Sequence, residues 1–180
     1  SLIKSGWENN ILFFLTTVKD CESFAADYSA KFPEINFLPL HSQTEDYSII
    51  YDKSDDKCQT VFFSTDIATS SMTLPKVGIV IDTGYGCQVS QDTNGFSTVK
   101  IVNLSIASSN QRKGRTGRVC EGTVIRCYSE NEMKLFEPYD LSESELMPPY
   151  QTTLTSISYG FDPKTIMRQE MTTRIADVED

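Results

Sequence analysis

The chain has 180 residues, of which 39% are hydrophobic and 23% charged, enough for a single domain with a real core. No apolar run approaches the roughly 20 residues that span a bilayer, so we expect no membrane partner. Five scattered cysteines form no C-x-x-C pair and His41 is the only histidine, which argues against a metal site. Reduced thiols and the lack of a secretory signal predict an intracellular location, in cytoplasm or nucleus. The chain opens with Ser1 rather than Met, so we expect a fragment of a longer protein.

The formal net charge is −9, but it is unevenly spread. Residues 1–129 hold 12 basic and 14 acidic side chains, whereas residues 130–180 hold 4 and 11. The acidity is therefore concentrated near the C-terminus. Because phosphate neutralisation drives affinity for nucleic acids, we expect this chain alone to bind them weakly.

Four short apolar runs predict buried strands, at residues 11–15, 37–40, 60–63 and 77–81. Helices are expected between them: one at 20–31 ended by Pro33, one at 44–51 before a charged loop at 52–57, and a short one after Ser64-Thr65-Asp66. This alternation predicts an α/β fold, a mostly parallel sheet with helices on both faces. Ligands of such sheets lie beyond the carboxyl ends of the strands, where the sequence places Thr16, Ser64, Thr65 and Asp82.

The second half of the chain breaks the rhythm. Alternating side chains at 89–102 flank Asn94-Gly95, which predicts an inserted β-hairpin. Ser108 or Ser109 is expected to cap a helix that carries the following basic string. Residues 122–128 predict another strand, Ser129 and Glu132 a capping box, and residues 152–159 a last helix.

Residues 111–118, Gln-Arg-Lys-Gly-Arg-Thr-Gly-Arg, hold four cations, with Arg112, Arg115 and Arg118 at every third position. On a helix this spacing stacks the guanidinium groups along one side. Such planar groups, which keep their charge, suit a polyphosphate. Gly114 and Gly117 would allow the close approach of a backbone or ligand. The alternatives are a solvated basic face, or arginines that only tie the helix to the sheet.

The octet resembles motif VI (Q-R-x-G-R-x-G-R) of superfamily 2 helicases, most like the DEAH/RHA and viral DExH branches. Residues 11–17 resemble motif IV, 38–43 the L-P-L-H-S-Q segment, and 64–73 motif V, with Asp66 in place of the usual Asn. The resemblance covers about residues 10–160. It implies a second RecA-like (P-loop NTPase-like) domain over residues 1–160, with 161–180 as an acidic linker or the start of a following domain.

The resemblance also implies residue roles. Arg115 and Arg118 would act as arginine fingers on the triphosphate, and Gln111 would position the attacking water. The cofactor-binding set would be Arg112, Ser71, Thr73 and Asp82, although Ser71 and Thr73 fit plain capping equally well. Contacts to the phosphates of single-stranded RNA would come from Thr16, Thr17, Thr65 and Ser64.

The sequence contains neither G-x-x-x-x-G-K-[S/T] nor a D-E-x-H or D-E-x-D box. ATP, or another nucleoside triphosphate, with Mg²⁺ would therefore bind mainly through an N-terminal RecA-like domain of the same protein, and this chain alone would be inactive. The implied function is the C-terminal motor domain of an RNA helicase. A DNA translocase, a remodeller of RNA–protein complexes and a degenerate binding scaffold remain as alternatives, and viral or cellular origin, nucleotide preference and polarity stay open.

Overall fold

The computed structural model describes residues 9–44, 47–48, 50, 59–69, 72–92, 94–146 and 149–166. By packing, the chain divides into two compact units, Ser1–Gln88 with Lys100–Asp140, and Val89–Val99 with Leu141–Asp180. The expected helix at 44–51, the loop at 52–57 and Ser71 lie largely or wholly outside the described residues. The domain boundary expected at residue 160 stays a prediction.

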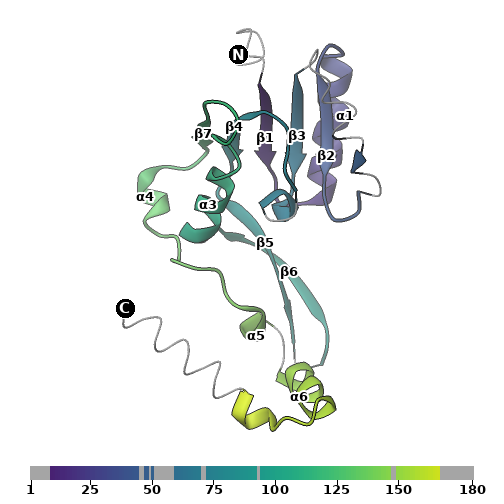
Figure 1. Ribbon diagram of the computed structural model, residues 1–180, viewed down its shortest axis with the longest axis vertical. Helices are drawn as coiled ribbons and strands as arrows, with labels where there is room; N and C mark the ends of the chain where they lie inside the picture. Colours follow the sequence, from purple (N-terminus) through teal and green to yellow (C-terminus); the bar gives the residue numbers. More distant parts are fainter. Residues whose placement is uncertain are drawn as a thin grey trace. The chain divides into compact units, whose positions relative to one another are not determined.

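The first unit is built on a five-stranded sheet with the order β2-β3-β1-β4-β7 (Figure 1). Its strands are β1 (Asn10–Phe14), β2 (Asn36–Leu40), β3 (Thr60–Ser64), β4 (Val77–Asp82) and β7 (Thr123–Arg126). All four pairings are parallel, so the carboxyl ends share one edge. At that edge Phe14 is level with Ser64 on one side and with Asp82 on the other.

Both faces of the sheet are covered, because successive side chains of a strand point to opposite faces. Ile11 of β1 joins an apolar cluster with Cys21 and Ala25 of helix α1 (Val18–Lys31). Leu12 joins the cluster on the other face, which includes Ala68 of the 3-10 helix η2 (Asp66–Thr69). The predicted α/β sheet with helices on both faces is confirmed.

The inserted hairpin is also confirmed, with strands β5 (Tyr85–Gln91) and β6 (Ser97–Asn103). Its turn is held by Asp92, whose Oδ1 accepts the backbone N–H groups of Asn94 and Phe96, each at 2.9 Å. Short side chains that bond the backbone two residues on favour such turns.

Helix α3 (Ile106–Lys113) is followed, within the described part of the chain, by three more helices. Helix α4 (Glu130–Met133) starts with the predicted capping box of Ser129 and Glu132. In the second unit, α5 (Glu143–Leu146) was not expected, and α6 (Pro149–Ser158) overlaps the helix predicted at 152–159. Within that unit the Tyr150 hydroxyl donates to Gln91 Oε1 at 3.0 Å, which links α6 to the hairpin tip.

Candidate functional site

Helix α3 (Ile106–Lys113) starts earlier than the sequence predicts. Its N-cap is Ser105, whose hydroxyl accepts the N–H of Ser108 at 3.0 Å, so the cap expected at Ser108 or Ser109 is wrong. The N–H groups of Ile106 and Ala107 donate to carbonyls at 137 and 138, and the Asp140 carboxylate accepts from Ser105 N and Ser108 Oγ. Residues 137–140 thus accept hydrogen bonds from the unpaired N–H groups at the start of α3 and fix the position of the helix.

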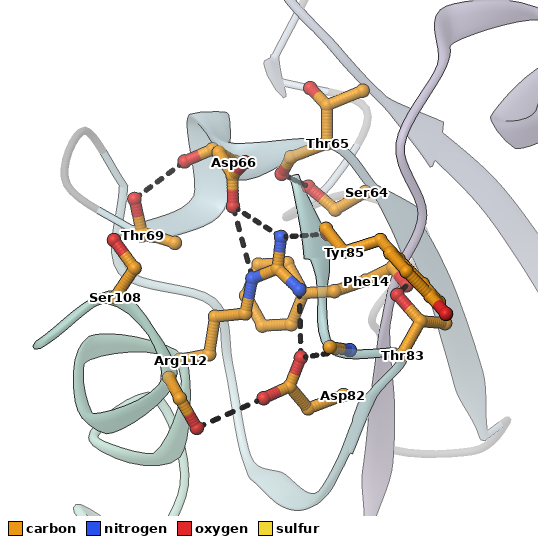
Figure 2. A network of polar contacts seen from close by, with 12 residues as sticks. Phe14, Ser64, Thr65, Asp66, Thr69, Asp82, Thr83, Tyr85, Ser108 and Arg112 are labelled. Carbon is orange, nitrogen blue, oxygen red and sulfur yellow. Dashed lines mark hydrogen bonds and ion pairs between the residues drawn. The ribbon is translucent and has the colours of Figure 1, made fainter. Parts of the chain in front are cut away.

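Arg112 points into the first unit and is fully buried (Figure 2). Its Nε and Nη2 donate to Asp66 Oδ1 at 3.0 and 2.7 Å, and Nη1 donates to Asp82 Oδ1 at 2.7 Å. Nη2 also donates to the Tyr85 carbonyl at 2.9 Å, and the guanidinium lies 4.7 Å from the centre of the Phe14 ring. A buried charge with this many partners braces a fold, since breaking such a pair leaves an uncompensated ion.

Asp82 is the second buried member of this network. Its Oδ1 also accepts Gly84 N at 3.1 Å, and its Oδ2 accepts the Tyr128 hydroxyl at 2.8 Å and the Ser109 hydroxyl at 3.2 Å. Neither Arg112 nor Asp82 presents a surface to solvent. Their side chains hold α3 against the ends of the strands, and the cofactor contact expected of them stays a prediction.

The other two arginines lie beyond the helix, in the arginine loop (residues 114–122). Helix α3 ends at Lys113, with Gly114 as its C-cap, so the three guanidinium groups do not stack along one helix as the sequence predicts. Gly117 has a φ of +77°, a left-handed conformation that turns the chain away from the helix. The loop is tied to β4 by the Thr116 hydroxyl, which donates to the Val77 carbonyl at 2.8 Å.

The two loop arginines have no carboxylate partner among the described residues. Arg115 is half-buried; its Nη1 makes one long bond of 3.4 Å to the Met72 carbonyl, and its buried Nε has no partner. Burial and the nearby Arg118 cation lower the pKa of the Arg115 guanidinium. Arg118 is exposed and donates through Nε to the Gly114 carbonyl at 2.9 Å. The loop thus holds two cations, Arg115 and Arg118, that form no ion pair with any described residue.

A second region lies at the carboxyl edge of the sheet. An open pocket of about 250 Å³ is lined by Leu15, Thr16, Thr83, Tyr85 and Ile101. Thr83 donates to the Phe14 carbonyl at 3.2 Å, which ties the ends of β1 and β4 together, and the Tyr85 side chain is 50% exposed. Thr65 follows β3 at the same edge and is partly exposed. Hydroxyls and an aromatic ring gathered at strand ends suit contacts to a sugar–phosphate chain.

Other predicted site residues are placed differently. Ser64 is buried and its hydroxyl donates to the Thr65 carbonyl at 2.8 Å, and its expected contact with RNA stays a prediction. Thr17 is the N-cap of α1, accepting Asp20 N at 3.1 Å and donating to Asp20 Oδ2 at 2.6 Å. Gln111 and Thr73 are exposed, and Ser71 lies outside the described residues.

Sequence reasoning missed Ser109, Tyr128, Thr83 and Tyr85 as site residues. Tyr128 is the last residue of one predicted strand and Thr83 follows closely on another, so the strand-end rule that found Asp82 could have found them. The described residues hold no group of three or more His, Cys, Asp or Glu side chains suited to a metal ion. None of the helices among them combines the length and apolar character that crossing a bilayer requires.

The parallel sheet, the hairpin and the helix that ends in an arginine loop define a RecA-like α/β domain. The family model described as the helicase conserved C-terminal domain matches residues 1–120. The chain belongs to this family, as the resemblance of its motifs implies.

Three relatives illustrate the similarity. The probable ATP-dependent RNA helicase DHX34 of Mus musculus is 30% identical over 156 residues, which cover 84% of this chain and 13% of that protein. The chloroplastic ATP-dependent RNA helicase DEAH11 of Arabidopsis thaliana is 33% identical over 136 residues, 72% of this chain and 7% of that protein. The ATP-dependent DNA/RNA helicase DHX36 of Mus musculus is 30% identical over 141 residues, 77% and 13% respectively. The chain thus spans a small part of the length of these relatives.

Proposed function

We propose that this chain is the C-terminal motor domain of an ATP-dependent RNA helicase, which completes a nucleotide site with its arginine loop and grips single-stranded RNA at its strand ends. The observation that carries the proposal is the unbalanced charge of Arg115 and Arg118. The Arg115 guanidinium is partly desolvated, and its buried Nε has no acceptor among the described residues. This arrangement fits an anion that another domain supplies. The ATP-dependent helicases among its relatives supply the nature of that anion, a nucleoside triphosphate.

Arg115 and Arg118 would bind the β- and γ-phosphate oxygens across a cleft between two domains. Hydrolysis builds negative charge on those oxygens, and fixed guanidinium groups stabilise it without reorganising at the moment of reaction. Gln111, exposed on the last turn of α3, is the proposed residue that orients the attacking water. Thr73 is proposed to lie on the ribose or Mg²⁺ side of the same nucleotide, and Ser71 with it.

The chain lacks a phosphate loop and an acidic box, so a partner RecA-like domain would supply the lysine and the Mg²⁺-binding carboxylate. Bound Mg²⁺ would neutralise phosphate charge when the partner domain holds it. The chain by itself is proposed to have no hydrolase activity.

At the other region, Thr16 and Thr65 are the proposed contacts to RNA phosphates, because both are partly exposed at the carboxyl ends of neighbouring strands. Thr17 keeps its proposed role only through its backbone, since its hydroxyl caps α1. Contacts of this type tolerate any base sequence and weaken with salt. The similarity to a DNA/RNA helicase keeps a DNA translocase as the second candidate.

The test uses the full-length protein that carries this chain with its phosphate-loop domain. Arg115→Ala should lower kcat for RNA-stimulated hydrolysis by about 10³-fold or more, the usual worth of an arginine finger. Its affinity for single-stranded RNA should stay within twofold, because the strand-end region is untouched. Lys113→Ala, an exposed cation two residues earlier, is the matched control and should keep normal turnover. Near-normal turnover by Arg115→Ala would refute the proposal.

A further inference from the structure

We propose that Tyr128 is a positioning residue for the arginine loop: its hydroxyl fixes the Asp82 carboxylate, and Asp82 in turn fixes Arg112 and the end of α3 from which the loop departs. The inference rests on the proposed function, because it concerns how the same two loop arginines are held in place. Nothing in the family match or in the motifs assigns a role to Tyr128.

The first step is how Tyr128 reaches Asp82. It follows β7, where Cys127 N donates to the Asp82 carbonyl at 2.9 Å, so the ends of β4 and β7 are already paired. The Tyr128 ring packs 5.0 Å from the Phe136 ring and lies directly on Gly84, where a Cβ would come within 2.6 Å of Tyr128 Cδ1. Only a glycine at that turn lets the ring lie flat enough for its hydroxyl to reach the carboxylate.

The second step is how the two oxygens of Asp82 are used. Oδ2 accepts the Tyr128 hydroxyl at 2.8 Å, and Ser109 Oγ lies 3.2 Å from Oδ2 and 2.6 Å from the Tyr128 oxygen, so its single proton serves one of these two acceptors. Oδ1 is left for the Arg112 guanidinium and Gly84 N. The hydroxyls therefore set the plane of the carboxylate, and that plane decides where Arg112 Nη1 must lie (Figure 2 shows the Arg112 side).

The hydroxyl is suited to be a permanent donor. Burial and the neighbouring Asp82 carboxylate raise the pKa of Tyr128 above that of an ordinary tyrosine. The phenol keeps its proton at neutral pH, so Asp82 Oδ2 always meets a donor rather than a second negative charge.

The position of Arg112 also determines where the arginine loop begins. The Arg112 carbonyl accepts Arg115 N at 3.1 Å, so the first turn of the arginine loop is built on the Arg112 backbone. The loop is tied again to β4 through Thr116 and Val77, at the opposite end of the strand from Asp82. Arg115 therefore depends on β4 at two points, and Tyr128 secures the one at Asp82.

The experiment again uses the full-length protein, with Tyr128→Phe, which keeps the ring and removes only the hydroxyl. We expect kcat for hydrolysis to fall about tenfold, the rate equivalent of one hydrogen bond to a charged group, with KM for the triphosphate and for RNA within twofold. Tyr139→Phe is the matched control: that side chain is 78% exposed, and kcat should not change. Ile79→Val, a buried change on the α1 face of β4, should lower the melting temperature without lowering kcat of the folded enzyme.

The following results would overturn or uphold the inference. A kcat of Tyr128→Phe equal to that of Tyr139→Phe overturns the inference, and so does a loss that Ile79→Val reproduces at equal melting temperature. Should Tyr128→Phe not fold, Ser109→Ala removes the other hydroxyl on the same oxygen and must lower kcat about threefold for the inference to stand. An inactive Arg115→Ala beside a fully active Tyr128→Phe defeats this inference alone, whereas an active Arg115→Ala defeats the proposed function itself.

Discussion

Arg112 and Arg115 stand three residues apart in one motif, yet they end in opposite surroundings. Arg112 sits among two carboxylates, a carbonyl and an aromatic ring, with no exposed surface. Arg115 has one long bond and a buried Nε without an acceptor. The backbone decides the difference, because α3 ends at Lys113 between them. A repeat of one residue type thus divides into a part that holds the fold and a part left available for a partner.

The largest expected effect is the loss of stability when the buried arginine, Arg112, is replaced. Arg112→Met in the 180-residue chain should lower the free energy of unfolding by about 3–5 kcal/mol, because it leaves Asp82 buried without its cation. Lys113→Met, its exposed neighbour, should stay within about 0.5 kcal/mol of wild type. Urea unfolding of both variants measures the difference. A small loss for Arg112→Met would mean that the network adds little to stability.

An intermediate effect concerns alkaline pH, which should weaken the buried network around Asp82. The folded pKa of Tyr128 is raised above the ordinary value of 10.0, so above that pH the unfolded chain releases its proton while the folded chain keeps it. Folding then loses stability as pH rises, whereas below pH 10 this contribution is constant. The difference in unfolding free energy between wild type and Tyr128→Phe should therefore be flat at neutral pH and shrink above pH 10. A difference that grows with pH would contradict the direction of the shift.

The smallest expected effect is the change in stability when the loop arginine, Arg115, is replaced. Arg115→Met should change the free energy of unfolding by less than about 0.5 kcal/mol, since it removes a cation that has no ion-pair partner among the described residues. Because the pKa of Arg115 is lowered by burial and by Arg118, relief of that repulsion favours a slight gain. Thermal unfolding beside Arg112→Met shows whether the two arginines differ as their surroundings require.

The sequence predicted the sheet, the hairpin and the capping box well, because each depends on neighbours in the chain. Buried runs such as Val61-Phe62-Phe63, the Asn94-Gly95 turn and the Ser129–Glu132 pair are local signals. The burial of Arg112 and its ion pairs could not be predicted from local signals. Its partners Asp66 and Asp82 lie 46 and 30 residues away, and only the folded sheet brings them together. The N-cap at Ser105 was missed for a related reason, since residues 137–140 help to fix the start of α3.

Gly117 carries a last consequence. Its φ is +77° and nothing lies within 4 Å of the position its own Cβ would take, whereas its main chain packs so closely on Gly122 that a Cβ there would come within 2.5 Å of Gly117 N. A left-handed φ strains an L side chain, so Gly117→Ala would be destabilising through its backbone although a methyl group has space there. The arginine loop therefore requires glycine at residue 117 for its backbone conformation and not for lack of side-chain space.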